Sequence, residues 1–254
     1  MKGNLTIDHG NTTVKVAFFI GTELVATNRF MRGDEQVLDR FISTYKPESA
    51  IMSSTASALD TQAIAALAEQ RCRRVIHLTH ETPMPITLGY RTPETLGRDR
   101  IATAVGAWSI AREQGNTGGV LVIDAGTAIT YDLTTADGCF AGGNIAPGVG
   151  LRFASLHEHT GRLPLVTAQG ETPLVGHDTI TAIRSGVMLG VTGEVRSYIA
   201  DLKREHPHLE VFITGGDGKW LCDSLQDVEA NYHEHLAAEG LNRIYLYNQA
   251  NGNC

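Results

Sequence analysis

The feature that most constrains this chain is a turn motif that occurs twice. Asp8-His9-Gly10-Asn11-Thr12 follows the apolar run 5–7, and Asp124-Ala125-Gly126-Thr127 follows the apolar run 120–123. A β-rich stretch comes after each copy, so each turn is predicted to join two strands of a hairpin. Glycine lets the backbone approach a ligand closely, the carboxylate can bind a cation, and the hydroxyl can donate to a phosphate oxygen. Two such hairpins predict a grip on a nucleoside triphosphate from two sides.

Composition narrows the range of partners. The 254 residues are 42% hydrophobic and 19% charged, which is typical of a globular protein with one large domain or two small ones. The formal net charge of −7 argues against a nucleic-acid partner, because phosphate backbones attract a basic face. No apolar run approaches the roughly 18 residues that span a membrane, and the N-terminus lacks the pattern of a signal peptide. We therefore expect a cytoplasmic protein that binds neither nucleic acid nor membrane.

Cysteine and histidine spacing does not predict a transition-metal site. The four cysteines contain no Cys-x-x-Cys pair: Cys72, Cys139, Cys222 and Cys254. The His-Glu-His triplets at 157–159 and 233–235 do not complete His-Glu-x-x-His, so surface helix or loop positions are the simpler interpretation.

The predicted elements follow one order in both halves of the chain. In the first half we predict strands at 4–8, 13–20, 23–30, 49–53 and 74–77, and helices at 35–44 and 59–70. In the second half we predict strands at 118–124, 127–134, 137–145 and 211–214, and helices at 178–205, after 217 and at 233–248. Three antiparallel strands followed by alternating helices and strands, twice over, predict an α/β fold with two domains, 1–115 and 116–254.

This pattern resembles the acetate and sugar kinase, Hsp70 and actin superfamily. The resemblance implies two ribonuclease H-like domains, each a mixed β-sheet flanked by helices, with an ATP cleft between them. Other nucleotide motifs are missing: the chain has no Gly-x4-Gly-Lys-[Ser/Thr], no Gly-x-Gly-x-x-Gly after a strand, and no protein-kinase signature. The segment Phe212–Asp217 ends a strand in Gly-Gly, which would let an adenosine pack against bare backbone. A plain helix-entry turn would look the same.

Five ordered blocks make the resemblance more specific. They are Asp8–Lys15, Gly97–Arg100, Asp124–Asp132, Gly142–Gly148 and Asp178–Gly186. Together they closely resemble type III pantothenate kinases from residue 5 to about residue 217, while the C-terminal forty or so residues add little. The resemblance implies transfer of the ATP γ-phosphate to pantothenate, the first step of coenzyme A biosynthesis. It also implies a homodimer that needs Mg²⁺ with ATP and a monovalent cation, K⁺ or NH₄⁺.

The resemblance assigns ATP contacts to the first turn and to one residue of the second. These residues are Asp8, His9, Gly10, Asn11, Thr12, Thr13, Val14, Lys15 and Thr127. Lys15 could reach the β- or γ-phosphate and stabilise charge during transfer, although an exposed strand lysine is the alternative. Asp8 would organise Mg²⁺ through water, since magnesium prefers oxygen ligands and keeps part of its hydration. Asp124 resembles the family's monovalent-cation ligand.

Asp99 is the predicted general base. A carboxylate within hydrogen-bond reach of the acceptor hydroxyl can take its proton as the phosphoryl group moves. Arg100 could instead clamp the pantothenate carboxylate, a geometry that suits a planar guanidinium. The alternative for the whole block is a charged helix N-terminus, where aspartate is favourable anyway.

The remaining substrate contacts come from the resemblance as well. They are Tyr90, Gly97, Arg98, Asp99, Arg100 and Thr179. Tyr90 could equally pack at a boundary, and Thr179 could be a helix N-cap. Arg98 stands where the family often has a small residue, which leaves the local electrostatics open. Two other classes of protein share the hairpins: another kinase or phosphohydrolase of the superfamily, which would lack the ordered blocks, and a nucleotide-sensing regulator, which would have lost Asp8, Lys15, Asp99 or Thr127.

Overall fold

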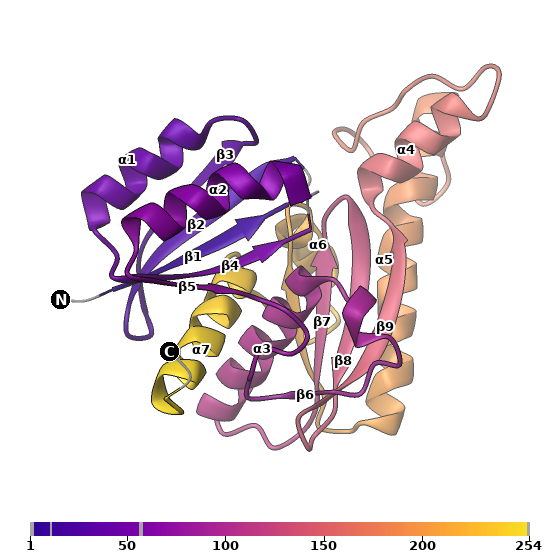
Figure 1. Cartoon of the computed structure of the whole chain (residues 1–254). Coiled ribbons are helices and arrows are strands. Elements are labelled where there is room, and N and C mark those ends of the chain that lie inside the picture. Colours follow the sequence, from indigo (N-terminus) through magenta and orange to yellow (C-terminus); the bar gives the residue numbers. More distant parts are fainter. Residues whose placement is uncertain (1–2, 11, 56–57, 253–254) are drawn as a thin grey trace. The chain divides into compact units, whose positions relative to one another are not determined.

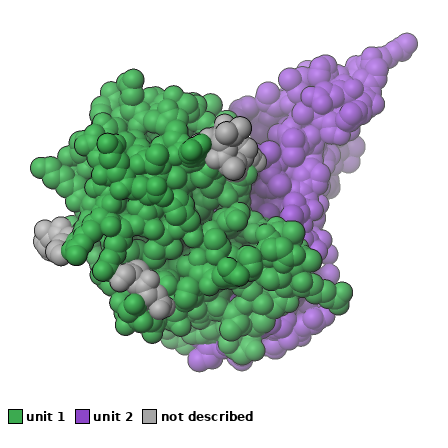
Figure 2. Space-filling model, in the orientation of Figure 1, with its two compact units in different colours: residues 1–115, 137–141, 235–254 green, residues 116–136, 142–234 purple. Residues whose placement is uncertain are grey.

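The computed structural model describes residues 3–10, 12–55 and 58–252, which form two compact units (Figures 1 and 2). Unit 1 comprises residues 1–115, 137–141 and 235–254, and unit 2 comprises residues 116–136 and 142–234. Unit 2 starts at residue 116 but differs from the predicted range 116–254, because the last helix clusters with unit 1. No helix in the described part of the chain is long and apolar enough to cross a membrane.

A five-stranded mixed sheet forms the centre of unit 1. Its strands are β1 (Asn4–His9), β2 (Thr13–Ile20), β3 (Glu23–Met31), β4 (Ser49–Ser54) and β5 (Arg74–His77), in the order β3-β2-β1-β4-β5. Strands β1, β2 and β3 pair antiparallel, whereas β4 and β5 join in parallel. The register sets Lys15 on β2 and Ser53 on β4 directly opposite Asp8. All three side chains therefore share one face at the end of the sheet.

Helices cover both faces of this sheet, as Figure 1 shows. The first face carries α1 (Glu35–Tyr45) and α2 (Ala58–Arg71), and the other carries α3 (Arg98–Glu113) and α7 (Leu236–Ala250). Strand β4 serves both cores, because successive side chains of a strand point to opposite faces. Ala50 and Met52 join the core beneath α1 and α2, while Ile51 joins the core with α3 and α7.

Close packing against α3 explains why α7 belongs to unit 1. A Cβ on Gly240 would overlap the carbonyl oxygen of Ala102, so only glycine lets the two helices approach this closely. A buried polar network then ties α7 to the sheet. The Ser49 hydroxyl donates to the Tyr245 hydroxyl at 2.6 Å, and the Asn242 amide donates to the carbonyl of Gly21 at 2.8 Å.

Unit 2 is built around the second sheet. Its strands are β7 (Val120–Ala125), β8 (Ala128–Thr134), β9 (Cys139–Pro147), β10 (Glu210–Thr214) and β11 (Asn231–Tyr232), in the order β11-β10-β7-β8-β9. The short strand β6 (Thr87–Leu88) of unit 1 pairs with the start of β9, whose residues 139–141 also belong to unit 1. The helices are α4 (Val149–Glu158), α5 (Thr179–Glu205) and α6 (Gly218–Ser224), and all three contribute to one apolar core with β7, β8 and β10.

The prediction of two mixed sheets flanked by helices is confirmed. The predicted strands and helices are present, most of them within two residues of their expected ends. Helix α4, strands β6 and β11 and the 3₁₀ turn at Pro93–Thr95 were not predicted. Strands β6 and β11 and the 3₁₀ turn contain only two or three residues each, and periodicity is weakest over so few. The final helix begins at Leu236 rather than at the predicted residue 233, because Asn231–Tyr232 form a strand with β10.

Candidate active site

Asp8 lies near the end of β1, largely buried, and faces the charged side chain of Lys15 on β2. Its side chain is 15% exposed, accepts a hydrogen bond from the Ser53 hydroxyl at 2.9 Å, and lies 4.0 Å from Lys15 Nζ. Burial raises the pKa of Asp8, and the nearby charge of Asp99 raises it further, while Lys15 and Ser53 act in the opposite direction. The carboxylate is therefore incompletely compensated, which favours binding of a cation.

The turn after Asp8 presents backbone rather than side chains. The Gly10 N–H donates to the carbonyl of Thr13 at 3.0 Å, and a Cβ on Gly10 would lie 3.3 Å from that oxygen, so a larger residue would require a small shift of the turn. His9 and Val14 are buried, whereas Thr12 is exposed and Thr13 is half-buried. Predicted contacts at His9 and Val14 could therefore use only main-chain atoms. Asn11 lies outside the described residues.

Asp99 lies in the first turn of α3, and Gly97 is the N-cap residue. The Asp99 carboxylate accepts the N–H of Arg100 at 2.9 Å. A Cβ on Gly97 would come within 2.5 Å of Asp99 Oδ1, so the glycine makes room for the carboxylate. Since the charge of Asp99 acts on Asp8, the fold brings the predicted base and the predicted magnesium residue of unit 1 into one electrostatic environment.

Arg100 is buried between aromatic rings. Its side chain is 7% exposed, and its guanidinium carbon lies 5.8 Å from the ring centroids of both Tyr90 and Phe140. The two rings meet edge to face at 6.2 Å. Cation–π contacts of this kind hold a guanidinium in a fixed orientation. Arg98 instead donates through Nε to the carbonyl of Leu78 at 2.9 Å, so its charge is anchored beyond the end of β5.

The second hairpin is built differently from the first. Asp124 pairs in register with Thr130 on β8, where the first hairpin has Lys15 opposite Asp8. Gly215 lies against it with φ +95°, and a Cβ there would overlap both Asp124 Oδ1 and the Ala125 carbonyl. The Thr127 side chain is exposed, and its carbonyl accepts the N–H of Gly148 at 3.0 Å. This turn therefore presents the Asp124 carboxylate, the exposed Thr127 side chain and glycine backbone, and the residue in register with its aspartate is a threonine rather than a lysine.

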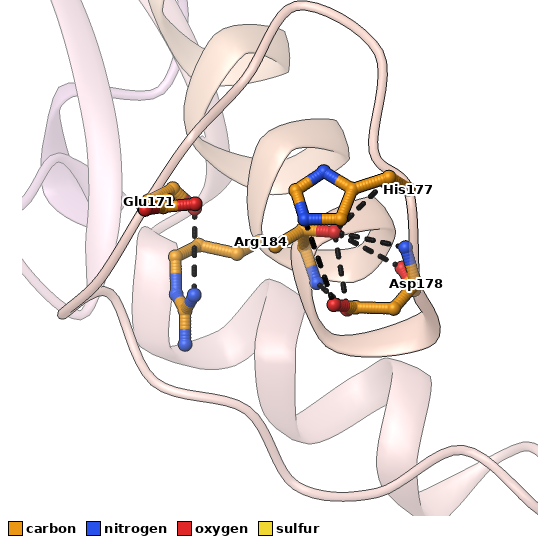
Figure 3. Close-up of polar contacts among 5 residues, drawn as sticks. Glu171, His177, Asp178 and Arg184 are labelled. Carbon is orange, nitrogen blue, oxygen red and sulfur yellow. Dashed lines mark hydrogen bonds and ion pairs between the residues drawn. The ribbon is translucent and has the colours of Figure 1, made fainter.

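Thr179 is the first residue of α5 but is not its N-cap. The cap is Asp178, whose carboxylate accepts the Thr181 N–H at 2.8 Å, while the Thr181 hydroxyl contacts the Asp178 main chain in a capping box (Figure 3). The loop before the cap is held by Arg184, which donates to the carbonyl of Glu171 at 3.4 Å (Figure 3). The N-cap interpretation of Thr179 is therefore wrong, and its exposed side chain is available for a ligand.

Two residues of the site escaped sequence reasoning. Ser53 donates to Asp8, and Phe140 packs on Arg100. A polar residue at the end of a strand parallel to β1 was the available signal for Ser53. Phe140 gave no signal, because its contact depends on the pairing of β9 with β6. Among the described residues no group of three or more His, Cys, Asp and Glu side chains could hold a metal ion.

Solved structures share this architecture. The glucokinase of an Antarctic psychrotroph aligns with a TM-score of 0.55 at 11% identity, covering 98% of this chain and 99% of that chain. The activator of 2-hydroxyisocaproyl-CoA dehydratase from Clostridium difficile, solved with bound ADPNP, aligns with a TM-score of 0.56 at 12% identity and covers 99% and 98%. Identities this low establish the fold alone. The chain therefore has the actin-like ATPase fold that these two proteins share.

Sequence comparison narrows that class to one family. The family model for type III pantothenate kinase matches residues 4–201. The type III pantothenate kinase of Phocaeicola vulgatus is 42% identical over 246 residues, which cover 96% of this chain and 98% of that protein. The enzyme of that name from Porphyromonas gingivalis W83 is 39% identical over 252 residues, covering 98% and 100%. The chain belongs to the type III pantothenate kinase family, a family of ATP-dependent kinases.

Proposed function

We propose that this protein transfers the γ-phosphate of ATP to the primary hydroxyl of pantothenate, giving 4'-phosphopantothenate in the first step of coenzyme A biosynthesis. Family membership supports the reaction. The observation that carries the residue assignment is the grouping of Asp8, Lys15 and Asp99 in one environment of unit 1, beside the buried Arg100. Phosphoryl transfer requires alignment and charge neutralisation more than covalent chemistry, and these groups supply both.

Asp8 and Lys15 act on the phosphate side of the reaction. The residues present fit Mg²⁺, because Asp8 is a partly desolvated carboxylate whose raised pKa reports uncompensated burial. Mg²⁺ bound with ATP supplies charge neutralisation at the phosphate oxygens. The Lys15 side chain is 52% exposed, and its Nζ lies 4.0 Å from Asp8 Oδ2. From there it can turn toward the γ-phosphate. Thr12 donates its exposed hydroxyl to a phosphate oxygen.

Asp99, Arg100, Tyr90 and Thr179 act on pantothenate. Asp99 accepts the proton of the attacking hydroxyl, and Gly97 leaves its carboxylate room to do so. Arg100 binds the pantothenate carboxylate and is oriented by Tyr90, with Arg98 as a further substrate contact held at the Leu78 carbonyl. Thr179 contributes its hydroxyl, which the Asp178 cap leaves available.

The second hairpin binds the monovalent cation and the nucleotide. Asp124 holds K⁺ or NH₄⁺, for which an oxygen donor packed against the Gly215 backbone is a suitable ligand. Thr127 donates to ATP from the exposed tip of the turn. Gly216 accepts the adenosine, because a Cβ there would meet no atom within 4 Å and the backbone is open, whereas Gly215 packs against Asp124.

The protein acts as a cytoplasmic homodimer. Large apolar side chains are exposed around α4, α5 and the loop between them: Ile145, Leu151, Leu165, Leu174, Val175, Ile180 and Leu189. Leu174 is 88% exposed, and Leu151 lines a cavity of about 550 Å³ together with Ile183 and Val187, among others. Exposed apolar side chains on neighbouring elements of unit 2 support a second copy of the chain as the partner. Light scattering of the wild type and of Leu151→Asp, which should be monomeric, tests this.

A coupled assay of ADP formation tests the reaction. We expect activity with ATP, Mg²⁺ and pantothenate in K⁺ or NH₄⁺, and little in Na⁺ alone. Asp99→Asn should lose on the order of 100-fold or more in kcat, the range of general-base catalysis, yet bind ATP as the wild type does. Asp39→Asn, which removes an exposed ion pair with Arg71 in the same unit, is the matched control and should keep wild-type activity. Near-normal turnover by Asp99→Asn would exclude it as the base.

A further inference from the structure

Glu194 on α5 holds two side chains from different elements. Its Oε1 accepts the hydroxyl of Tyr131 on β8 at 2.7 Å, and its Oε2 accepts the guanidinium of Arg152 on α4 at 2.7 Å. Glu194 is 28% exposed and Arg152 is 22% exposed, so the ion pair is shielded from much of the solvent. Tyr131 is buried, and burial together with the Glu194 carboxylate raises the pKa of its hydroxyl, which therefore stays a donor.

Arg152 carries this contact to the second hairpin. Its Nε donates to the carbonyl of Pro147 at 2.8 Å, at the residue before Gly148. The Gly148 N–H donates in turn to the carbonyl of Thr127 at 3.0 Å, and a Cβ on Gly148 would come within 2.5 Å of that oxygen. The Pro147–Gly148 segment thus packs against the turn at Gly126–Thr127 so closely that no side chain would fit at residue 148.

The hydrogen bond between Tyr131 and Glu194 holds the other strand of the same hairpin, β8. Tyr131 lies on β8, four residues after Thr127, and its ring packs at 4.3 Å between centroids on Tyr198 of α5. Glu194 therefore fixes both flanks of the turn, the strand that leaves it and the segment that covers it. Preorganised donors and ligands contribute most when their supports are rigid.

We propose that Glu194 is a positioning residue that sets the geometry of the Asp124–Thr127 turn through Arg152 and Tyr131, and so tunes binding of the monovalent cation and ATP. This inference rests on the proposed role of that turn in cation and nucleotide binding. Removing the contacts of Glu194 with Arg152 and Tyr131 should weaken the binding of the monovalent cation and of ATP together. The contacts of Tyr90, Asp99 and Arg100 with pantothenate lie in unit 1 and should be unaffected. Thr179 lies on α5 as Glu194 does, but at its first residue beside the Asp178 cap, so its contact should be unaffected as well.

Three variants separate positioning from general stability. Glu194→Gln should raise the half-activating K⁺ concentration and the KM for ATP about 10-fold, as expected for loss of one charge-assisted hydrogen bond. Tyr131→Phe removes only the hydroxyl and should raise both by about 3-fold, the effect of a weaker neutral bond. Asp227→Asn breaks the exposed pair with Arg196, also on α5, and should change neither by more than about 2-fold, as surface pairs contribute little.

A double variant tests whether Arg152 and Glu194 act through each other. Arg152→Gln combined with Glu194→Gln should raise the half-activating K⁺ concentration by less than the product of the two single effects, because each single variant already breaks the same ion pair. The KM for pantothenate should stay within about 2-fold of wild type in all of these variants, while a general loss of folding would move every constant.

Asp124→Asn distinguishes the failure of this inference from the failure of the proposed function. If Asp124→Asn abolishes K⁺ activation but Glu194→Gln and Tyr131→Phe leave both constants unchanged, the positioning role is wrong. If Asp124→Asn leaves K⁺ activation intact, the turn does not bind the cation, and both the proposed role of Asp124 and the inference fall. Should Glu194→Gln fail to fold, the isosteric Tyr131→Phe variant decides the question alone.

Discussion

Gly240→Ala probes whether a helix far along the chain controls the catalytic helix. Gly240 on α7 lies against α3, the helix that begins at Arg98 and carries Asp99 in its first turn. A Cβ at this position would overlap the carbonyl oxygen of Ala102 and lie 2.7 Å from its carbonyl carbon and 2.9 Å from the nitrogen of Gly106. These are backbone atoms in the middle of a helix, so rotation of a side chain cannot relieve the overlap.

The cost follows from the distance that the helices must move apart. Nonbonded carbon atoms are comfortable at about 3.5–4.0 Å, so α7 would have to move on the order of 1 Å. Over-packing of this kind costs about 1–3 kcal/mol or more, and alanine recovers at most about 1 kcal/mol of helix propensity over glycine. A net loss of about 2 kcal/mol corresponds to a Tm lower by roughly 4–8 °C for a protein of this size. Misplacement of a reacting group by about 1 Å can cost about 100-fold in rate, so kcat should fall at least 10-fold.

Thermal unfolding followed by circular dichroism, together with the kinase assay, measures both effects. The matched control is Gly193→Ala on α5, where a Cβ would meet no atom within 4 Å and helix propensity should make the change neutral or stabilising by up to about 1 kcal/mol. Light scattering at the same concentration verifies that assembly is unchanged. A Gly240→Ala protein as stable and active as wild type would refute the argument that close contact of α3 and α7 positions Asp99.

Two further predictions concern buried and capping carboxylates. Asp8→Asn should abolish phosphoryl transfer yet raise the Tm of the ligand-free protein at neutral pH. Burial raises the pKa of Asp8 in the folded protein above its unfolded-state value of about 4. The Asp8 carboxyl therefore costs the wild type no stability below the unfolded-state pKa, and the wild type loses stability as pH rises through the folded-state pKa. A Tm difference between Asp8→Asn and wild type that does not grow with pH would contradict this. Asp178→Ala should lower the Tm at pH 7, because hydrogen bonds from Thr181 lower the pKa of Asp178 and its stabilisation is present above the unfolded pKa. That difference should shrink in acid as pH falls through the folded pKa, and a pH-independent difference would show that the charge is irrelevant.

The local elements and the two hairpins could be predicted because their signals are local. A run rich in β-branched and aromatic residues marks β2 over 13–20, and helical spacing marks α5 over 179–205. What could not be predicted depends on pairing between distant segments. Phe140 reaches Arg100 only because β9 pairs with β6, and α7 joins unit 1 only because Gly240 fits against Ala102. The family blocks end near residue 217, so the resemblance gave no reason to connect α7 with the helix of Asp99.

The role of Thr179 shows how a sequence can leave two explanations equal until one contact decides between them. A threonine at a helix start satisfies either a cap or a substrate, and both predict the same residue at the same place. The structure gives the cap to Asp178, with Thr181 completing the box. A substituted Thr179 should therefore leave the thermal stability of α5 nearly unchanged, since its hydroxyl is not needed there. Substrate affinity is then the property that a Thr179→Val variant should alter.

The two turns differ in the residue that lies opposite the aspartate in the hairpin. Asp8 faces Lys15 and Ser53, and its charge is only partly compensated within the fold. Binding of a divalent cation with ATP would remove that deficit, so part of the strain stored in the ligand-free site becomes favourable when the nucleotide arrives. Asp124 has Thr130 opposite it across the hairpin and the Gly215 backbone beside it. Under the proposed roles, Mg²⁺ with ATP binds at the Asp8 turn, which has a lysine in register, and K⁺ or NH₄⁺ binds at the Asp124 turn, which has a threonine there.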